Sequence, residues 1–244
     1  MNDPKPPLID LRDVHFASGG VDILQDITLC ADEHRIGVLG RNGSGKTSLA
    51  RVMAGLVQPD QGQVRIGGID VAKDRKAALG VIGILFQNPD HQIIFPTVEE
   101  ELAFGLTQMG QSKQQATAQS AAMLEQFDRA HWAKASIHQL SQGQRQLVCL
   151  MAVLAMAPEV IVLDEPFAGL DIPTTRSLER AFSELDVTLV QITHDPQGVA
   201  AYDRVIWLDR GQIVADGRPA QVIASFTSRM EQLGASDDLT DLTG

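Results

Sequence analysis

The glycine-rich segment Gly40–Thr47, which reads Gly-Arg-Asn-Gly-Ser-Gly-Lys-Thr, limits the possible folds of this chain more than any other stretch. Because glycine has no Cβ, Gly40, Gly43 and Gly45 can adopt backbone conformations that turn successive N–H groups toward one anion. Lys46 adds a positive charge at the same place. The segment therefore predicts a loop that wraps around a phosphate group.

The flanking sequence predicts that this loop joins a strand to a helix. Arg35 to Leu39 is typical of a short buried strand, and Thr47 to Leu56 has the apolar periodicity of a helix. The pattern G-x-x-x-x-G-K-[ST] in this context is a phosphate-binding loop, in which the lysine contacts the β- and γ-phosphates and the hydroxyl ligates Mg²⁺. We predict contacts to a nucleoside triphosphate from Arg41, Asn42, Gly43, Ser44, Gly45, Lys46, Thr47 and Ser48.

The bulk composition excludes several classes of protein. The hydrophobic share of 44% is sufficient for a sizeable core, and the net charge of -11 argues against a nucleic-acid partner, which needs a basic face. The longest apolar run, Leu147 to Ala157, is shorter than the about 20 residues that span a membrane. We therefore expect a soluble, cytoplasmic chain that reaches a membrane only through a partner. Cys30 and Cys149 lie in apolar segments and are expected to be buried free thiols.

Two acidic residues, Asp164 and Glu165, end the apolar run that begins at Val160. Carboxylates at the end of a buried strand are costly unless they meet a metal ion or a positive group. Phosphoryl transfer needs one carboxylate to hold Mg²⁺ and a second group to orient or deprotonate the attacking water. We assign Asp164 to the metal, together with Thr47, and Glu165 to the general base. A solvated strand end is the alternative interpretation.

A second possible anion site lies at Leu140–Gln144, before another helical run. The Ser141 hydroxyl, the open N–H groups near Gly143 and the positive end of the helix dipole can all favour an anion. Taken alone, this stretch is better explained as an ordinary serine cap. One triphosphate, however, needs only one such helix start.

Together the motifs resemble the ATP-binding subunits of ABC transporters, over about residues 8–223. In that family the loop is Walker A and Val160–Glu165 is Walker B. The counterparts of the Q-loop, the signature, the D-loop and the switch histidine are Gln87, Leu140–Gln144, Gly169–Asp171 and His194. The resemblance implies ATP and Mg²⁺ as ligands.

The resemblance also implies roles for these residues. Two ATPase chains, identical or related, would pair head to tail, so that Ser141, Gly143 and Gln144 of one chain act on the ATP of the other. Gln87 would contact Mg²⁺ and the attacking water, and His194 would contact the γ-phosphate. With Glu165 these two residues form the expected catalytic set. Asp171 would communicate across the dimer.

Two positions depart from the pattern of the family. The signature has Gln142 where glycine is usual, so a side chain lies near the expected dimer seam. The aromatic residue on which the family stacks adenine falls on Ser18, and Phe16 is the candidate substitute. Loss of one stacking contact corresponds to about 1–3 kcal/mol. We therefore expect weaker binding or selection of the nucleobase.

Gln87–Ile93 and Phe95–Leu106 resemble the energy-coupling factor (ECF) class of importers, which take up vitamins or transition-metal ions such as cobalt and nickel. In that class a transmembrane coupling protein lays short helices into grooves of two ATPases, and a small membrane protein binds the substrate. The groove would lie at 87–101, where Asp90 and Glu100 either pair with basic residues of the coupling helix or are solvated charges. The short chain after the shared core is similar to the ATPases of biotin transporters. We expect a peripheral protein on the cytoplasmic face of the membrane.

These patterns predict an α/β fold. It has a P-loop NTPase (RecA-like) core at about 8–87 and 158–225, and an N-terminal antiparallel β part. A helical subdomain is inserted at about 88–157, and a disordered acidic tail follows at 231–244. All of these form a single ATP-binding domain. The alternatives are a soluble ABC-type ATPase that acts on ribosomes or DNA, and a P-loop kinase. The first usually has two ATPase domains, and the second has no use for Leu140–Gln144.

Overall fold

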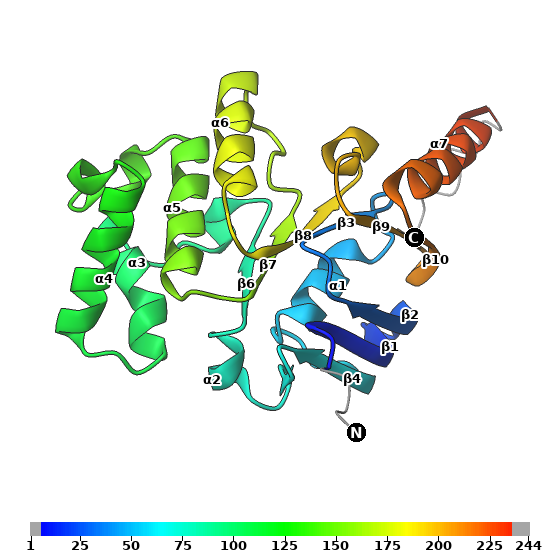
Figure 1. Cartoon of the computed structure of the whole chain (residues 1–244), viewed down its shortest axis with the longest axis horizontal. Coiled ribbons are helices and arrows are strands. Elements are labelled where there is room, and N and C mark those ends of the chain that lie inside the picture. Colours follow the sequence, from blue (N-terminus) through cyan, green and yellow to red (C-terminus); the bar gives the residue numbers. More distant parts are fainter. Residues whose placement is uncertain (1–5, 236–244) are drawn as a thin grey trace.

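A computed structural model describes residues 6–235, which form two β-sheets with helices packed around them (Figure 1). The larger sheet has six strands in the order β10-β9-β3-β8-β7-β6. All run parallel except β10, which is antiparallel to β9. The strands are β3 (Arg35–Leu39), β6 (Ile82–Leu85), β7 (Val160–Asp164), β8 (Thr188–Thr193), β9 (Arg204–Asp209) and β10 (Gln212–Gly217).

The central strands β3, β8 and β7 determine where the polar groups of the molecule meet. Every residue of β7 and β8 is buried, and β3 is buried from Ile36 onward. Continuous apolar sequences of this kind are typical of parallel strands that are covered on both faces. The carboxyl ends of parallel neighbours lie at one edge of the sheet, so Gly40, Glu165 and His194, which follow β3, β7 and β8, are brought to the same edge.

The second sheet is antiparallel, with four strands in the order β2-β1-β4-β5. Its strands are β1 (Ile9–Ser18), β2 (Val21–Ala31), β4 (Gln61–Ile66) and β5 (Ile69–Asp70). Helix α1 (Lys46–Met53) follows the glycine loop, and its buried residues join both sheets in one apolar cluster. This arrangement confirms the predicted α/β class with an N-terminal antiparallel part.

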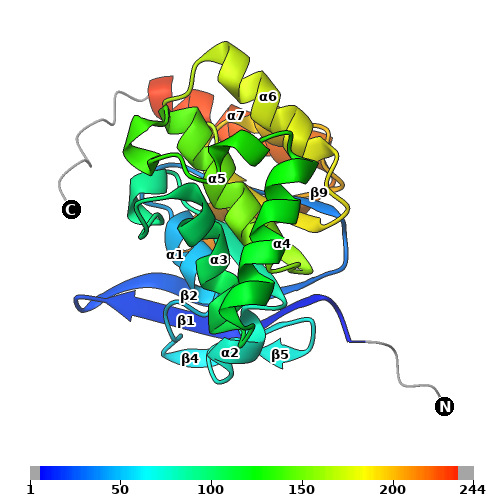
Figure 2. The same ribbon diagram turned by 90° about the vertical axis from the view of Figure 1, so that its left-hand side faces the viewer.

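Three helices pack against one another beside the edge strand β6, as Figures 1 and 2 show. They are α3 (Val98–Gln108), α4 (Lys113–Gln126) and α5 (Gln142–Ala155). Val98, Leu102, Leu124 and Val148 form their shared core. These helices are the inserted helical part that the sequence predicts, while its limits near residues 88 and 157 stay a prediction.

The remaining helices are α2 (Arg75–Ala78), α6 (Ile172–Ser183) and α7 (Pro219–Ala235). The prediction of a disordered tail from 231 is wrong for 231–235, which continue α7; the rest of the tail lies outside the described residues. Helix α1 ends at Met53 rather than Leu56, because Gly55 adopts a φ of 67° and the chain turns away. No helix within residues 6–235 is long and apolar enough to cross a membrane.

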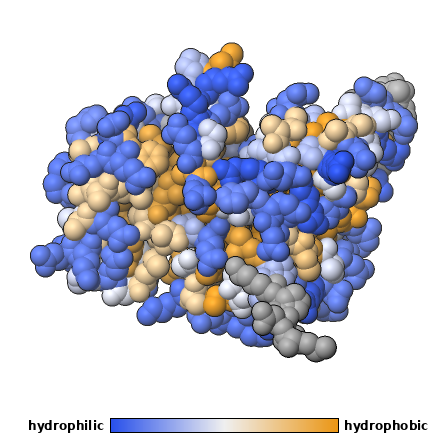
Figure 3. All heavy atoms as spheres, viewed as in Figure 1, coloured by the Kyte–Doolittle hydropathy of each residue, from blue (hydrophilic) through white to orange (hydrophobic). Residues whose placement is uncertain are grey.

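Hydrophobic residues on the surface in the view of Figure 3 gather between the group of helices α3, α4 and α5 and the larger sheet. Cys149 is buried, as predicted, but Cys30 is exposed because it lies on the outer face of β2; both are free thiols.

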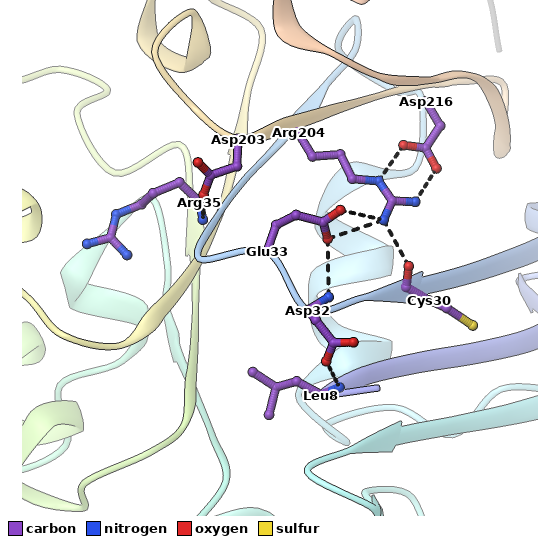
Figure 4. Close-up of polar contacts among 8 residues, drawn as sticks. All are labelled: Leu8, Cys30, Asp32, Glu33, Arg35, Asp203, Arg204 and Asp216. Carbon is purple, nitrogen blue, oxygen red and sulfur yellow. Dashed lines mark hydrogen bonds and ion pairs between the residues drawn. The ribbon is translucent and has the colours of Figure 1, made fainter. Parts of the chain in front are cut away.

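A cluster of charged groups joins the two sheets at the end opposite the glycine loop (Figure 4). The Arg204 guanidinium of β9 donates two hydrogen bonds of 2.6 Å to the Asp216 carboxylate of β10. Its third nitrogen donates to the Cys30 carbonyl of β2, at 2.9 Å, and to Glu33, at 3.2 Å. The hydrogen bonds to Asp216 raise the pKa of Arg204 further. The Arg204 guanidinium therefore links β9 and β10 to the end of β2 through hydrogen bonds.

We expect Arg204→Gln to lower the free energy of unfolding by about 1–3 kcal/mol, because it breaks charge-assisted hydrogen bonds at a side chain that is 20% exposed. Urea unfolding at pH 7 measures the change. Lys73→Gln is the matched control, since it removes an exposed ion pair with Asp70 and should cost under about 1 kcal/mol. Equal effects of the two substitutions would contradict a fastening role for Arg204.

Candidate active site

The carboxyl ends of β3, β6, β7 and β8 border a cavity of about 490 Å³. It combines the glycine loop, two acidic groups, an amide and a histidine. The residues that line it are Ile23, Asn42, Gly43, Gly45, Lys46, Thr47, Ser48, Gln87, Asp164, Glu165 and His194. The chain therefore brings together most of the residues that the sequence predicts for one site. Of the predicted nucleotide contacts, Arg41, Ser44 and Phe16 are not among the lining residues.

The loop is held open by glycine conformations and by a neighbouring hairpin. Gly43 and Gly45 have φ values of 79° and 100°, which residues with a Cβ rarely adopt. The N–H of Gly211, in the turn between β9 and β10, donates to the Ser44 carbonyl at 3.0 Å, while the Gly211 carbonyl accepts from Gln25 of β2 at 2.9 Å. The loop is thus fixed to both sheets from behind, and its interior is left for an anion.

Lys46 is the buried cation of the site. Its side chain folds back under the loop, where Nζ donates to the carbonyls of Gly40 at 2.8 Å and Arg41 at 2.9 Å. Burial lowers the pKa of Lys46, and the charges of Glu165 and Asp164 oppose that shift. An ammonium held in this way, with no salt bridge to any residue from 6 to 235, presents positive charge to the cavity, which suits a group that must meet phosphate oxygens.

Asp164 at the end of β7 has the properties of a metal ligand. Burial raises the pKa of Asp164 above its ordinary value of 3.8, although a hydrogen bond from Thr47 and the charge of Lys46 favour the ionised form. Its Oδ1 atom is buried and accepts no hydrogen bond from any residue within 6–235. An orphaned carboxylate oxygen beside a threonine hydroxyl fits Mg²⁺, which takes one or two protein oxygens and shares the rest with water and phosphate.

Glu165 is positioned by its own backbone and by β8. It has a φ of 49°, a strained value for a residue with a side chain, and its N–H donates to the Ile192 carbonyl at 3.0 Å. One carboxylate oxygen contacts His194 Nδ1 at 2.8 Å, and the other accepts from the Thr193 hydroxyl at 3.3 Å. The carboxylate is therefore oriented at both oxygens, as a general base requires. No motif singled out Thr193, whose place directly before His194 was the available signal.

Phe16, the predicted adenine contact, does not line the cavity. Phe16 pairs with Leu24 across β1 and β2, and it packs against the core. Ile23, which directly precedes Leu24 in β2, lines the cavity instead, and its carbonyl approaches Gly45 closely. No motif singled out Ile23, because its position depends on the register of a hairpin and on its long-range docking to the loop.

The signature segment lies apart from this cavity within one chain. Ser141, Gly143 and Gln144 line a different cavity of about 430 Å³, between α5 and α6. Ser141 caps α5 by accepting from the N–H of Gln144 at 3.3 Å, and the Gln144 amide oxygen accepts from the N–H of Ser141 at 2.8 Å. A Cβ at Gly143 would clash with Thr174, so this glycine also permits the close approach of α5 to α6.

Gln142, the residue that departs from the family pattern, lies against the D-loop. Its amide group is within 4 Å of the position that a Cβ would take at Gly169, whose φ is 76°. Asp171, two residues later, caps α6 by accepting from the N–H of Thr174 at 2.9 Å. The extra side chain in the signature thus occupies space beside the segment that leads to Asp171.

An α/β sheet with a glycine loop between β3 and α1, and with acidic residues at the end of β7, defines a P-loop nucleoside triphosphatase. The family model described as "ABC transporter" matches residues 24–168. The chain belongs to the ABC transporter family, and it is an ATP-hydrolysing transporter subunit.

Curated relatives and solved structures agree with this assignment. The chain is 49% identical to the biotin transport ATP-binding protein BioM of Rhodobacter capsulatus over 92% of this chain and 96% of that protein. It is 38% identical to the biotin transport ATP-binding protein BioM of Rhizobium etli, over 87% of this chain and 97% of that protein.

Among solved structures, cbiO1 of Clostridium perfringens, part of the ABC transporter complex cbiONQ, has a TM-score of 0.76 at 25% identity and covers 94% of this chain and 95% of its own. The ATP-binding cassette MJ0796, a dimer in a post-hydrolysis state with ADP and Pi bound, has a TM-score of 0.72 at 25% identity and covers 86% and 98%.

We expect Asp164→Asn to stabilise the nucleotide-free protein at pH 7 by about 1–3 kcal/mol, because the cost of burying this charge outweighs its stabilisation by Thr47 and Lys46. A raised folded-state pKa means that the stability contributed by this carboxyl is present below its unfolded pKa and is lost as pH rises through the folded value. The stability gained by Asp164→Asn should therefore be smaller at acidic pH, where the wild-type carboxyl is protonated.

Thermal unfolding with and without Mg²⁺ and ATP measures the effect of Asp164→Asn, and the variant should lose the extra stabilisation that Mg²⁺ gives with ATP. Asp171→Asn is the control, since hydrogen bonds from Thr174 lower the pKa of Asp171 and its neutralisation should not stabilise the fold. A destabilised Asp164→Asn protein would contradict the account of this carboxylate.

We expect Glu165→Gln to lower kcat for ATP hydrolysis by about 100-fold or more, because an amide cannot accept the proton of the attacking water. Steady-state phosphate release measures kcat, and nucleotide titration should show that ATP affinity is retained. Glu159→Gln, an exposed residue directly before β7, is the matched control. Hydrolysis by the Glu165→Gln variant at the wild-type rate would rule out Glu165 as the general base.

Proposed function

We propose that this chain is the ATPase of an ECF-type importer that takes up biotin. The observation that carries the proposal is the 49% identity to a biotin transport ATP-binding protein over nearly the full length of both chains. Structural similarity to cbiO1, part of the complex cbiONQ, supports the ECF class. Substrate contacts would belong to another chain, so cobalt or nickel uptake remains the alternative.

The working unit in this proposal is a dimer of ATPases, identical or related. Ser141 and Gly143 line a cavity separate from the one that contains Lys46, so one chain alone leaves the signature without a phosphate partner. A head-to-tail pair would bring the signature of each chain to the triphosphate of the other. Each active site would then be complete only when the two chains are paired.

The chemistry at each site follows from this chain's own groups. Asp164 and Thr47 would hold Mg²⁺, which neutralises developing charge on the phosphates when bound. Lys46 and the N–H groups of the glycine loop would bind the phosphate oxygens. Glu165, oriented by Thr193 and His194, would take the proton of the attacking water. His194 and Gln87 would orient the γ-phosphate and the water from the open side of the cavity.

A groove between β6, α3 and α5 is the proposed binding site for a coupling helix of the membrane partner. Its cavity is about 290 Å³, with Ile94 and Leu56 exposed by 68% and 49% at its rim. The buried Glu101 carboxylate shapes this rim by accepting from the N–H groups of Ile94 and Phe95, both at 2.9 Å. Apolar lining residues include Leu56, Ile82, Ile84, Phe86, Ile94 and Phe104.

Acidic groups of the segment 87–101 favour a basic helix as the occupant of this groove. Asp90 and Glu100 are exposed and do not line the groove themselves, but in the sequence they flank Gln92 and Ile94, which do. An apolar groove whose rim segment also carries acidic residues complements a short amphipathic helix that carries arginine or lysine. Binding there would hold the chain on the cytoplasmic face of the membrane.

An affinity pull-down from native membranes, followed by mass spectrometry, tests the proposal. We expect recovery of a multi-spanning coupling protein and of a small membrane protein that retains biotin. Glu100→Lys should lose both partners while keeping ATP affinity, and Glu125→Lys, an exposed charge on α4, is the matched control. Ribosomal or DNA-processing proteins without a membrane partner would contradict the proposal, and a bound cobalt or nickel ion would correct the substrate.

A further inference from the structure

Two adjacent residues of α5 hold the segment that carries Gln87 from both sides. Gln146, which is 2% exposed, donates from Nε2 to the Phe86 carbonyl at 3.2 Å. Arg145 places Nε 3.0 Å from Oδ1 of Asp90, in the short 3-10 helix η1 (Pro89–His91). The backbone before Gln87 and the first carboxylate after it therefore both depend on the first turns of α5.

Arg145 also contacts the signature segment. Its Nη1 donates to the Leu140 carbonyl at 2.7 Å, and Leu140 directly precedes Ser141. One guanidinium thus bridges a loop at the cavity of Lys46 and a loop at the cavity of Ser141. Because the guanidinium is planar, a movement of one of its partners changes its geometry toward the other.

The contact with Asp90 is suited to change. The Arg145 side chain is 22% exposed, whereas that of Asp90 is 59% exposed. Although Nε and Oδ1 are 3.0 Å apart, Nε has no well-aligned hydrogen bond to any residue within 6–235. The backbone of Asp90 is fixed, since its N–H donates to the Asn88 side chain at 3.0 Å. Its carboxylate can therefore rotate toward or away from Arg145 while the turn is retained.

We infer that Arg145 is a positioning residue for ATP hydrolysis, which links the Gln87 segment of one ATP site to the Ser141 segment of the other. The inference rests on the roles proposed above for Gln87 and Ser141. Asp90 is the exposed end of this link, and it lies two residues before Gln92, which lines the groove in which a basic partner would dock. A cation that reached Asp90 would draw its carboxylate from Arg145 and so change the support of Leu140.

The first test measures ATP hydrolysis by the full chain with Arg145→Gln, Asp90→Asn and the double variant. We expect each single substitution to lower kcat by about tenfold, with KM for ATP within about twofold, because binding residues are untouched while positioning is lost. The kcat of the double variant should be no lower than that of either single variant, because both substitutions break the same link. Arg145→Lys, which keeps the charge, should recover part of kcat, and Lys73→Gln should behave as wild type.

Hydrogen–deuterium exchange provides a second readout that does not depend on hydrolysis. Asp90→Asn, an isosteric change at an exposed site, should increase amide exchange at residues 140–144, because the Asp90 carboxylate forms its ion pair with Arg145, which in turn donates to the Leu140 carbonyl. Unchanged exchange there, additive losses of kcat, or a wild-type kcat for Asp90→Asn would overturn the inference. Gln87→Ala with wild-type kcat would instead remove the role proposed for Gln87, and the exchange result would still decide whether the physical link exists.

Discussion

The structure depends on the burial of one positive charge, the ammonium group of Lys46. The loop must place the carbonyls of Gly40 and Arg41 around it, which requires the glycine conformations that the sequence supplies. The strand order then places the acidic end of β7 near enough to oppose the lowering of its pKa by burial. A loop that satisfies a cation with neutral carbonyls, rather than with a carboxylate, keeps that cation available for an anionic ligand.

Features that depend on neighbouring residues were predictable from the sequence. The glycine loop, the buried strands and the helix starts are short-range consequences of backbone freedom, apolar runs and caps, and the structure contains them with ends shifted by a few residues. The same short-range chemistry cannot identify function by itself. Helix α4 begins with Ser112 and Gln115 in the same reciprocal capping arrangement that Ser141 and Gln144 form in α5. Only the order of all the motifs along the chain distinguished the start of α5 as a functional segment from the start of α4.

Features that depend on long-range docking were not predictable. Ile23 reaches the cavity through the register of β1 with β2, and Gly143 is required by the approach of Thr174 from another helix. The exposure of Cys30 follows from which face of β2 meets the core, which apolar content alone does not reveal. Helix α7 packs Val222, Phe226 and Met230 against the cluster around Trp207, and its continuation beyond Met230 to Ala235 was not predicted.

The contacts of Arg204 and Gly211 between the two sheets have a consequence for the cavity that contains Lys46. Arg204 fastens one end of the antiparallel sheet to β9 and β10, and Gly211 fastens the glycine loop to β2 and to the same hairpin at the other end. The wall of the cavity that includes Ile23 is therefore joined to the larger sheet at both of its ends. The helices α3, α4 and α5 instead pack on the side of the edge strand β6, where α5 also contacts α6. The two cavities thus differ in their surroundings, because that of Lys46 lies between joined sheets and that of Ser141 lies between helices.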